Sequence, residues 1–479
     1  MLYLQITETK ISMKDLITIM RLIGYSFIIG SAIILYFCHY LDSSHFLNSA
    51  YSETSEILNL SNEIINSTFP KIITHNNNIY VVWSGNVGHG VNNEIQSDIF
   101  LAKSENKGNS FGEFVNLSNN SGSSLNPQSE IASNNIYVVW EDDTLAKTYG
   151  QTANTSILLR QSNDDGTTFL PSISLSYINA DSSNPDITAI NNNSVYVVWQ
   201  GDLDESSKIL YTKNIANKNT EFSEQQIISV NKGDSYEISP HIIISNDTVN
   251  IIWNDFNPKE RSSQILKRSS IDGGITFGQV IQLSNSSDFS INDINNVYNN
   301  NVYIAWQGNI KGQFDIFLSR SSDGGITFSQ PINLSNDTGD SINPNLIVSD
   351  NNVLVIWNDN STKKYNVIIK KSSDGGITFS QPINLSNTTN SNSINPQLAA
   401  TANELYVVWQ GNMKGQFDIF LSRSSDGGIT FSQPINLSNT TNSNSINPQL
   451  AATANELYVV WQEDISGNNQ IYFTTVRIS

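Results

Sequence analysis

Short apolar runs that end in tryptophan recur along the chain at a nearly constant interval. Most of these runs are apolar or aromatic at every position, as in LYVVW at residues 405–409. A run that is apolar on both faces predicts a strand packed between two layers. The spacing between successive tryptophans is 51 to 59 residues, and they stand at Trp83, Trp140, Trp199, Trp253, Trp306, Trp357, Trp409 and Trp461. A period near fifty that is carried by β-forming runs is typical of a β-propeller.

The repeat at residues 393–438 shows what one unit contains. Its apolar stretches are separated by turn residues and by a polar loop expected at residues 410–417. They predict an inner, a second, a third and an outer strand, at residues 397–401, 405–409, 418–423 and 431–437. Four short strands of this kind make one propeller blade.

The ends of the chain complement each other in this scheme. The last repeat lacks an outer strand, while residues 56–61 resemble the outer strand at residues 381–386. An N-terminal strand that joins the C-terminal blade would close the ring and remove its free sheet edges. We therefore predict an all-β, eight-bladed propeller over residues 55–479 that is closed by its N-terminal strand.

A second repeating segment, Ser-X-Asp-X-Gly-X-Thr-Phe, follows the third strand. Asp and Ser side chains stabilise tight turns through bonds to the backbone, and Gly supplies the positive φ that such turns need. A weaker copy with Asn106 in place of Asp lies at residues 104–111, and the third repeat has lost the segment. Complete copies lie at residues 162–169, 270–277, 321–328, 372–379 and 424–431.

This segment resembles the Asp-box of sialidase-like, BNR-repeat β-propellers, and the resemblance covers nearly all of the chain after residue 54. In that family the Asp-box joins the third and fourth strands on the face away from the ligand. The resemblance therefore implies a structural role for the five aspartates, which are Asp164, Asp272, Asp323, Asp374 and Asp426.

The enzymes of the family resemble one another in three arginines that clamp a carboxylate, an Asp acid/base, and a Tyr activated by a Glu. Such a clamp depends on bidentate guanidinium–carboxylate pairing. Of the seven arginines here, only Arg261 lies in a loop between second and third strands, so three cannot be assembled on the expected ligand face. Residues 372–410 and 424–462 are identical, which favours binding over catalysis. We predict a non-catalytic module that binds a glycan or a cell-surface protein, with a sialidase-like exo-glycoside hydrolase as the alternative.

Residues 22–41 are apolar enough to form a transmembrane helix. As a helix they would span a bilayer core, and Lys10, Lys14 and Arg21 precede them. The positive-inside rule then places residues 1–21 in the cytoplasm, a stalk at residues 42–54 outside, and the propeller beyond it. A cleaved signal peptide, which would release a secreted propeller, is the alternative.

The formal net charge of −19 disfavours nucleic-acid binding. The single cysteine, Cys38, lies in the apolar stretch, so the repeats contain no disulfide. The chain contains 15 Asn-X-Ser/Thr sequons, which makes it a candidate glycoprotein if it is exported. We expect a monomeric ectodomain.

The most divergent loops in the repeats are expected at residues 84–97 and 141–154. Long loops on a rigid scaffold are where recognition is commonly placed. We therefore expect the ligand near Glu141, Asp142, Asp143 and Tyr149, with Arg261 as a further candidate. No cofactor is expected, although gathered carboxylates at this rim could hold Ca²⁺, and the alternative is an acidic loop in solvent.

Overall fold

The structure is a computed structural model, and the residues that it describes form almost nothing but strands, turns and loops. It describes residues 54–477 apart from residues 90–94, 146–153, 178–179, 191–193, 204–205, 216–217, 231–234, 285–288, 311, 387–391, 403 and 414. The predicted membrane segment at residues 22–41 lies outside the described residues. Within the described part of the chain, no helix is long and apolar enough to cross a membrane.

The strands form antiparallel groups in chain order, which we call blades. The first three blades are β2(Ile65–His75), β3(Asn78–His89), β4(Ile95–Ser104) and β5(Val115–Asn116); β6(Ser124–Ala132), β7(Asn135–Asp142), β8(Ser156–Ser162) and β9(Ile173–Ser174); and β10(Ser182–Ile190), β11(Ser194–Leu203), β12(Ser206–Ile215), β13(Lys218–Phe222) and β14(Gln226–Ile227).

The largest sheet has eight strands. Its members are β15(Tyr236–Ser245), β16(Thr248–Asn257), β17(Ser262–Ser270), β18(Ile281–Gln282), β19(Phe289–Tyr298), β20(Asn301–Ile310), β21(Gln313–Ser321) and β22(Ile332–Asn333). A single parallel pairing, between Ser263 and Phe289, joins its two antiparallel halves.

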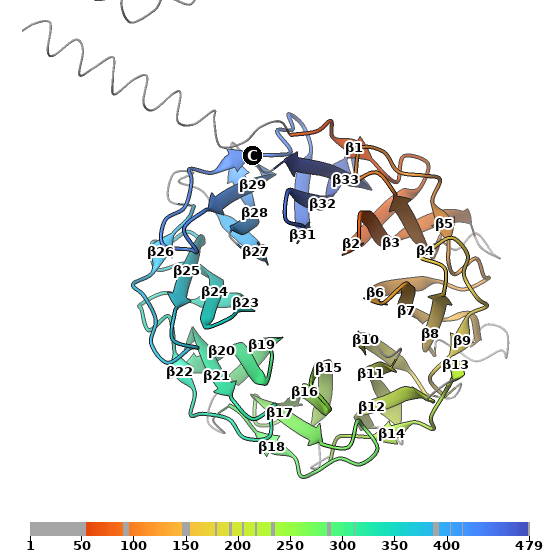
Figure 1. The fold of residues 1–479 in the computed structure, drawn as a ribbon, viewed down its shortest axis with the longest axis horizontal. Helices are drawn as coiled ribbons and strands as arrows, with labels where there is room; N and C mark the ends of the chain where they lie inside the picture. The colour runs from red at the N-terminus through yellow and green to blue at the C-terminus, as the bar shows by residue number, and fades with distance from the viewer. Residues whose placement is uncertain are drawn as a thin grey trace, which may run out of the picture. The chain divides into compact units, whose positions relative to one another are not determined.

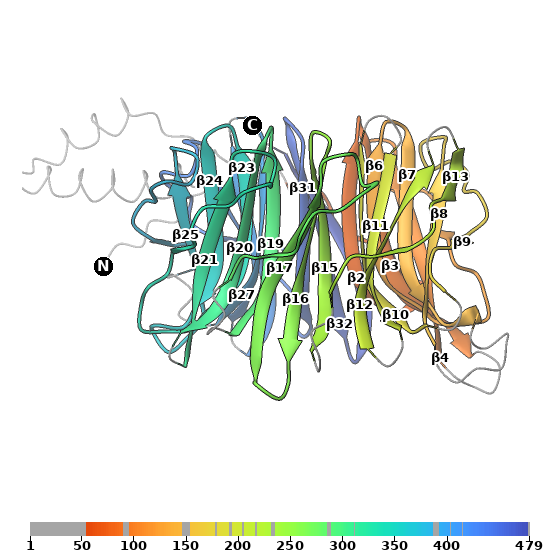
Figure 2. The same ribbon diagram turned by 90° about the horizontal axis from the view of Figure 1, so that it is seen from below.

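The remaining blades have four strands each. They are β23(Ser341–Ser349), β24(Asn352–Asp359), β25(Asn366–Ser372) and β26(Ile383–Asn384); β27(Ser393–Ala400), β28(Leu405–Met413), β29(Gln416–Ser424) and β30(Ile435–Asn436); and β31(Asn444–Ala452), β32(Glu456–Ile465), β33(Asn468–Arg477) and β1(Leu58–Asn59). Within residues 55–475 the blades stand around a ring, and the first strand of each blade borders its centre (Figure 1). Seen from the side, the strands run roughly along the ring axis (Figure 2).

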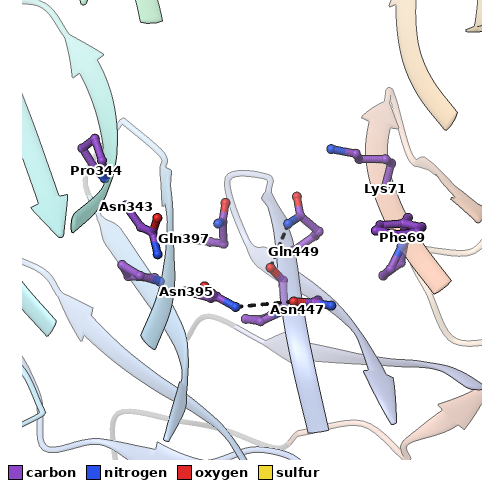
Figure 3. A pocket seen from close by; sticks show the side chains of 11 residues that line it. Phe69, Lys71, Asn343, Pro344, Asn395, Gln397, Asn447 and Gln449 are labelled. Carbon is purple, nitrogen blue, oxygen red and sulfur yellow. Dashed lines mark hydrogen bonds between the residues drawn. The ribbon is translucent and has the colours of Figure 1, made fainter. Parts of the chain in front are cut away.

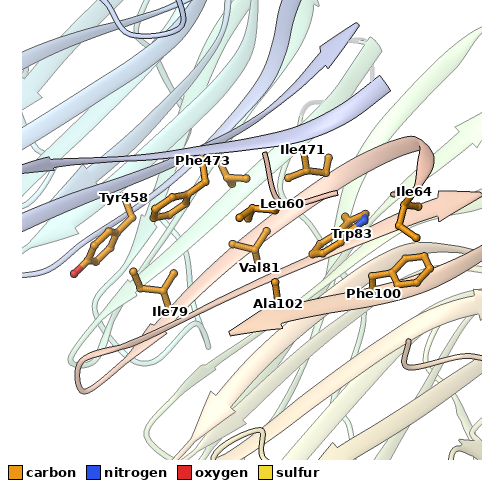
Figure 4. Close-up of a cluster of buried hydrophobic side chains, with 11 residues drawn as sticks. Leu60, Ile64, Ile79, Val81, Trp83, Phe100, Ala102, Tyr458, Ile471 and Phe473 are labelled. Atoms are coloured by element: carbon orange, nitrogen blue, oxygen red, sulfur yellow. The ribbon is translucent and has the colours of Figure 1, made fainter. Parts of the chain in front are cut away.

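The expected closure by the N-terminal strand is present. In β1, Leu58 pairs with Phe473 and Asn59 with Tyr472 of β33, so the first and last strands share a sheet. Leu60 packs with Ile471 and Phe473 in one buried cluster that also holds Trp83 of the first blade (Figure 4). Burial of this apolar surface stabilises the closed ring.

The tryptophans occupy equivalent places in the core, as the sequence pattern predicted. All eight side chains are at most 2% exposed. Each lies on the second strand of its blade. Trp199 shares a buried cluster with Tyr137 of the preceding blade, and Trp357 shares one with Tyr303. The period of the sequence therefore corresponds to one inter-blade layer of the core.

The strand order predicted for residues 393–438 is confirmed, but the predicted loop at residues 410–417 is wrong. There β28 and β29 continue to a tight turn, and Met413 pairs with Gln416. The divergent loop expected at residues 84–97 is likewise mostly strand, since Asn86 pairs with Ser97. The reason is that polar residues extend the ladder beyond the apolar run. We call this end of each blade the hairpin end.

The opposite end of each blade carries the Asp-box turn. Ser424, at the end of β29 and the start of an Asp-box, pairs with Leu405 at the start of β28. The turn of one blade packs on the second strand of the preceding blade. The backbone of Gly375, for example, accepts a bond from the Tyr303 hydroxyl at 3.3 Å. We call this end the Asp-box end.

Candidate functional site

The first strand of each blade begins at the hairpin end with a bulge. In β27 the register with β28 shifts between Ile394 and Gln397, around Pro396. The residue before the proline has a positive φ, for example 52° at Asn395 and 53° at Asn447. Asn tolerates this left-handed conformation better than other non-glycine residues. The repeated Asn-Pro pair therefore fixes the path of the chain beside the centre of the ring.

These bulges are tied to the neighbouring blade by hydrogen bonds. The residue after the core tryptophan of one blade accepts a bond from the backbone N–H of the positive-φ asparagine in the next blade. The donor–acceptor distances are 2.7 Å for Asn184 to Glu141, 2.8 Å for Asn343 to Gln307, 3.3 Å for Asn395 to Asn358 and 3.0 Å for Asn447 to Gln410. The amides at this end of the ring therefore hold successive blades together.

A pocket of about 320 Å³ opens among these bulges at the hairpin end, between the first strands β23, β27, β31 and β2 (Figure 3). Proline rings and the amides of Asn and Gln make most of its wall. The lining residues are Phe69, Pro70, Lys71, Asn343, Pro344, Asn395, Pro396, Gln397, Asn447, Pro448 and Gln449. Two of the wall amides bond each other, because Asn395 Nδ2 donates to Asn447 Oδ1 at 3.4 Å.

Phe69 breaks the pattern of this wall. It occupies the position before proline that Asn395 and Asn447 hold in their blades, and its φ is 55°. A bulky residue at positive φ is an outlier that costs free energy of order 1–3 kcal/mol. The Phe69 side chain is nevertheless 50% exposed, so burial of its ring does not explain its presence. A strained, exposed aromatic residue beside a pocket is a candidate ligand contact.

Lys71, two residues later on β2, is the charged member of the described pocket lining. Its side chain points from β2 toward β31 (Figure 3). Burial lowers the pKa of Lys71 below its ordinary value, while the negative charge of Asp186 partly opposes this shift. The pocket thus combines one aromatic face, one cationic group and a wall of neutral amides.

Of the residues expected to contact a ligand, Glu141 and Asp142 are engaged in structural bonds. Glu141 Oε1 accepts from Asn126 Nδ2 at 3.0 Å, in addition to the backbone of Asn184. Asp142 is fully buried and accepts the indole N–H of Trp140 at 3.1 Å. Both carboxylates therefore have partners within the protein.

The other expected contacts are Asp143, Tyr149 and Arg261. Asp143 accepts the backbone N–H of Ser123 at 2.6 Å, and Tyr149 lies outside the described residues. Arg261 is exposed at the hairpin end between β16 and β17, with a φ of 51°. None of these residues lines the pocket beside Phe69 among the residues described there. Their role as ligand contacts stays a prediction.

The five Asp-box aspartates share one geometry. In the turn of β17, Asp272 Oδ1 accepts from the Ser270 hydroxyl at 2.6 Å and from the Thr276 backbone at 2.9 Å. Asp164, Asp323, Asp374 and Asp426 make the corresponding bonds. Bonds from Thr168 lower the pKa of Asp164 to about 2, so that this carboxylate stays ionised. These bonds close each turn on itself.

Four arginines at the ends of third strands bind within the protein at the Asp-box end. Arg160 and Arg268 donate to the carbonyls of Leu117 and Ile228 in the preceding blade, at 2.6 and 2.8 Å. Arg320 donates to Gly375 at 3.2 Å, and Arg423 pairs with Glu404. These guanidinium groups bridge backbone segments and do not converge on the pocket.

Tyr–Glu pairs are present, but at the Asp-box end. Tyr458 donates its hydroxyl to Glu456 Oε2 at 2.9 Å at the start of β32. Burial, together with this bond, raises the pKa of Tyr458 well above its ordinary value, so the phenol stays protonated. This pair lies at the start of β32, at the end of the ring opposite the pocket. Across the described part of the chain, no three His, Cys, Asp or Glu side chains gather in a way that could hold a metal ion.

The sequence contained a signal for the pocket that the loop-based expectation overlooked. Every comparable blade with a proline at this bulge has Asn or Ser before it, whereas the first blade has Phe69. A departure from the repeat at one position, rather than a difference in loop length, marked the site. The convergence of four separate first strands could not be inferred without the ring geometry.

Comparison with known proteins agrees with this architecture. Residues 194–459, more than half of the chain, match the family model described as BNR repeat-like domain. The chain is similar to the polysaccharide lyase Uly1 (TM-score 0.47, 10% identity, covering 76% of this chain and 91% of that one) and to an ulvan lyase (TM-score 0.47, 8% identity, covering 87% and 95%). It is also similar to the Trypanosoma rangeli sialidase (TM-score 0.36, 11% identity, covering 61% of this chain and 54% of that one).

No curated protein sequence matches the chain. The family match therefore rests on the repeats themselves, which carry the core tryptophans and the Asp-box turns described above. The chain belongs to the BNR repeat-like domain family, the sialidase-like group of β-propellers.

Proposed function

We propose that this protein is a non-catalytic, glycan-binding β-propeller, and that the ligand occupies the pocket beside Phe69. The observation that carries the proposal is the strained, half-exposed Phe69 where comparable blades use Asn or Ser. Aromatic rings bind the apolar face of a sugar ring by stacking on its C–H groups. The amides of Gln397 and Gln449 supply donors and acceptors for hydroxyl groups, as expected of a pocket with a few convergent polar groups.

The composition of the pocket supports binding rather than glycoside hydrolysis. Hydrolysis of a glycosidic bond generally uses two carboxyl groups that flank the bond. The described lining includes no Asp, Glu or His. The arginines that a sialidase-like clamp would need are bound to backbone carbonyls and to Glu404 at the Asp-box end. The exo-glycoside hydrolase stays the alternative that the experiment below excludes or establishes.

We also propose that the ring has eight blades. The two halves of the eight-stranded sheet, β15–β18 and β19–β22, each have their own core tryptophan, Trp253 and Trp306. One parallel pairing between Ser263 and Phe289 joins them, whereas neighbouring strands inside each half share long antiparallel ladders. The halves are therefore two blades that pack against each other and share a single ladder pairing. With the six other groups of strands they make eight.

For localisation we propose a single-pass anchor at residues 22–41 that holds the propeller outside the cell, with a cleaved signal peptide as the alternative. The length of the apolar stretch and the basic residues before it support this orientation.

Some sequon residues have structural roles: Asn333 Nδ2 and the Ser335 hydroxyl both donate to Asp315, at 2.8 and 2.9 Å. We propose that ligand binding requires no divalent cation.

The function is tested with the purified protein on a glycan array and in a fluorogenic sialoside assay. We expect array binding that is lost in Phe69→Asn, kept in Arg261→Ala, and unchanged by a chelator. We expect no sialoside turnover. Turnover would establish the hydrolase instead. If Phe69→Asn bound like the wild type, and binding were lost only when residues 141–154 were replaced by a short loop, the ligand site would move to that rim.

A further inference from the structure

A row of exposed isoleucines marks the Asp-box end of four consecutive blades. The exposed fractions are 62% for Ile275, 46% for Ile326, 56% for Ile377 and 67% for Ile429, and Ile271 beside the first of them is 71% exposed. Single exposed apolar side chains are common on protein surfaces, but these four recur at equivalent turns on one face of the ring.

The turns do not require these isoleucines for their own stability. The residue at this position contributes its backbone N–H, as Ile275 does to Asp272 Oδ1 at 3.0 Å, while its side chain stands in solvent. The same position holds Thr167 in the second blade and Asn109 in the first. A polar residue is therefore compatible with the turn, and the apolar residue in four consecutive blades calls for a partner outside the propeller.

Basic residues accompany the row. Each third strand of the same four blades carries a half-buried basic residue one or two positions before the serine that begins the Asp-box. These residues are Arg268, Arg320, Lys371 and Arg423. The Arg268 and Arg320 side chains donate to the backbone carbonyls of Gly278 and Gly375, and Arg423 pairs with Glu404. Basic side chains beside exposed apolar ones suit the boundary between lipid headgroups and acyl chains.

The chain also enters the propeller at this end. The backbone N–H of Ser55 donates to Thr475 at 2.9 Å, at the end of β33. Thr475 lies against the Asp-box turn of the first blade, since a Cβ placed on Gly108 would stand 2.6 Å from its hydroxyl oxygen. The proposed stalk at residues 42–54 therefore joins the Asp-box end, and fully extended it reaches at most roughly 45 Å.

We propose that the Asp-box end of the propeller rests on the outer surface of the membrane, with Ile275, Ile326, Ile377 and Ile429 inserted among the lipid headgroups. The inference rests on the membrane anchor proposed above. Each turn presents one such side chain between glycine and threonine, so the row consists of separate prongs rather than a continuous patch. A fluid interface accepts separate prongs, whereas a protein partner requires a complementary packed core. The pocket, at the hairpin end, then faces away from the membrane.

The test uses the full chain with Cys38→Ser, reconstituted in phosphatidylcholine vesicles. A bimane fluorophore is attached to a new cysteine at Ile326→Cys or Ile377→Cys, and nitroxide-labelled lipid serves as the quencher. We expect loss of fluorescence at both positions. The control is Arg261→Cys, an exposed position at the hairpin end, where we expect no quenching.

A second variant separates docking from tethering. Replacing the four isoleucines of the row by threonine, the residue of the second blade, should leave Tm unchanged because the side chains are exposed. A bimane probe at Ile271→Cys should be quenched when the row is intact and should not be quenched in this variant. The variant should still float with the vesicles, because the anchor is unchanged. If the labelled Ile326→Cys protein, with the other isoleucines of the row kept, floats with the vesicles but shows no quenching, the docking is wrong and the membrane anchor still stands. A protein that does not float would overturn the anchor as well. Cross-linking of two copies through residue 326 in detergent would assign the row to a second copy instead.

Discussion

At the scale of single residues, the chain departs from its own repeat where a side chain has a particular task. Phe69 and Asp337 are two such positions, and the other blades provide natural controls for both. The comparison requires no other protein, because adjacent blades present the same backbone with a different side chain. Each departure therefore leads to a substitution that restores the repeat.

Replacing Phe69 by Asn should stabilise the protein. The left-handed φ of 55° is unfavourable for Phe and is the one that Asn395 and Asn447 adopt in their blades. We expect a gain in the free energy of unfolding of about 1 kcal/mol, measured by thermal denaturation. Asn126→Phe is the reverse substitution in the second blade, where φ is 51°, and it should lower Tm. An unchanged or lower Tm in Phe69→Asn would show that the site is not strained.

Asp337 stands where the first blade has Asn120. The Asn120 amide donates to Asp142 Oδ2 at 2.7 Å, whereas Asp337 faces Asp359 and can donate only when protonated. Lys370 and Asp315 are the other charged groups that act on this site. Loss of hydration and the interaction with Asp359 raise the pKa of Asp337 to about 7 from its ordinary 3.8.

The sign of the pH dependence follows from this shift. The folded state holds a proton that the unfolded state releases near pH 4, so the contribution of Asp337 to stability is complete below that pH and is lost as the pH rises through about 7. Asp337→Asn should therefore raise Tm at pH 8 and change it little at pH 4. Equal effects at both pH values in thermal denaturation would contradict a shared proton.

At the scale of elements, the sequence predicted the strand order of a blade but not the full length of its strands. The apolar runs mark only the part of each strand that packs in the core. Gln410, just beyond such a run, is polar but only 4% exposed, and it accepts the backbone N–H of Asn447. The hydrophobic pattern predicts a loop at such a residue, because the sequence does not show the hydrogen bond to the next blade that buries it. The outer strands, such as β30, are two residues long and almost equally hard to recognise.

The Asp-box turn is an element whose glycine has two tasks that can be separated. Gly325 has a φ of 92°, and a Cβ there would lie 2.3 Å from Oδ1 of the buried Asn250 in the preceding blade. Gly312 has the same φ with nothing within 4 Å. We expect Gly312→Ala to cost about 1 kcal/mol from backbone strain alone, and Gly325→Ala to cost clearly more, in chemical denaturation. Equal costs would mean that the turn does not press on the preceding blade.

At the scale of the whole molecule, the closure of the ring was predictable because the unpaired outer strand could be counted. Removing residues 55–62 takes away β1 and Leu60, and leaves β33 with a free edge beside Ile471 and Phe473. We expect a lower Tm and a larger hydrodynamic volume in size-exclusion chromatography. A truncated protein that melts and elutes like the full chain would contradict closure through β1.

The position of the proposed ligand pocket was not predictable at this scale. Phe69 and Lys71 come from the start of the ring, and the rest of the pocket wall comes from the last blades, more than 270 residues later in the chain. Only the closed ring brings them together. In the expected loops, Asn86 pairs with Ser97, and Glu141 bonds Asn126 of its own blade and Asn184 of the next. A role of these loops in binding stays a prediction.

The proposed function depends most directly on whether Phe69 binds the ligand. The decisive measurement is an isothermal titration of the best glycan from the array with the wild type, Phe69→Tyr and Phe69→Asn, each checked for folding by its melting curve. We predict that the tyrosine variant, which keeps the aromatic face, binds like the wild type. The asparagine variant should fold at least as stably and bind no glycan. Equal affinity in all three proteins would contradict the proposed site.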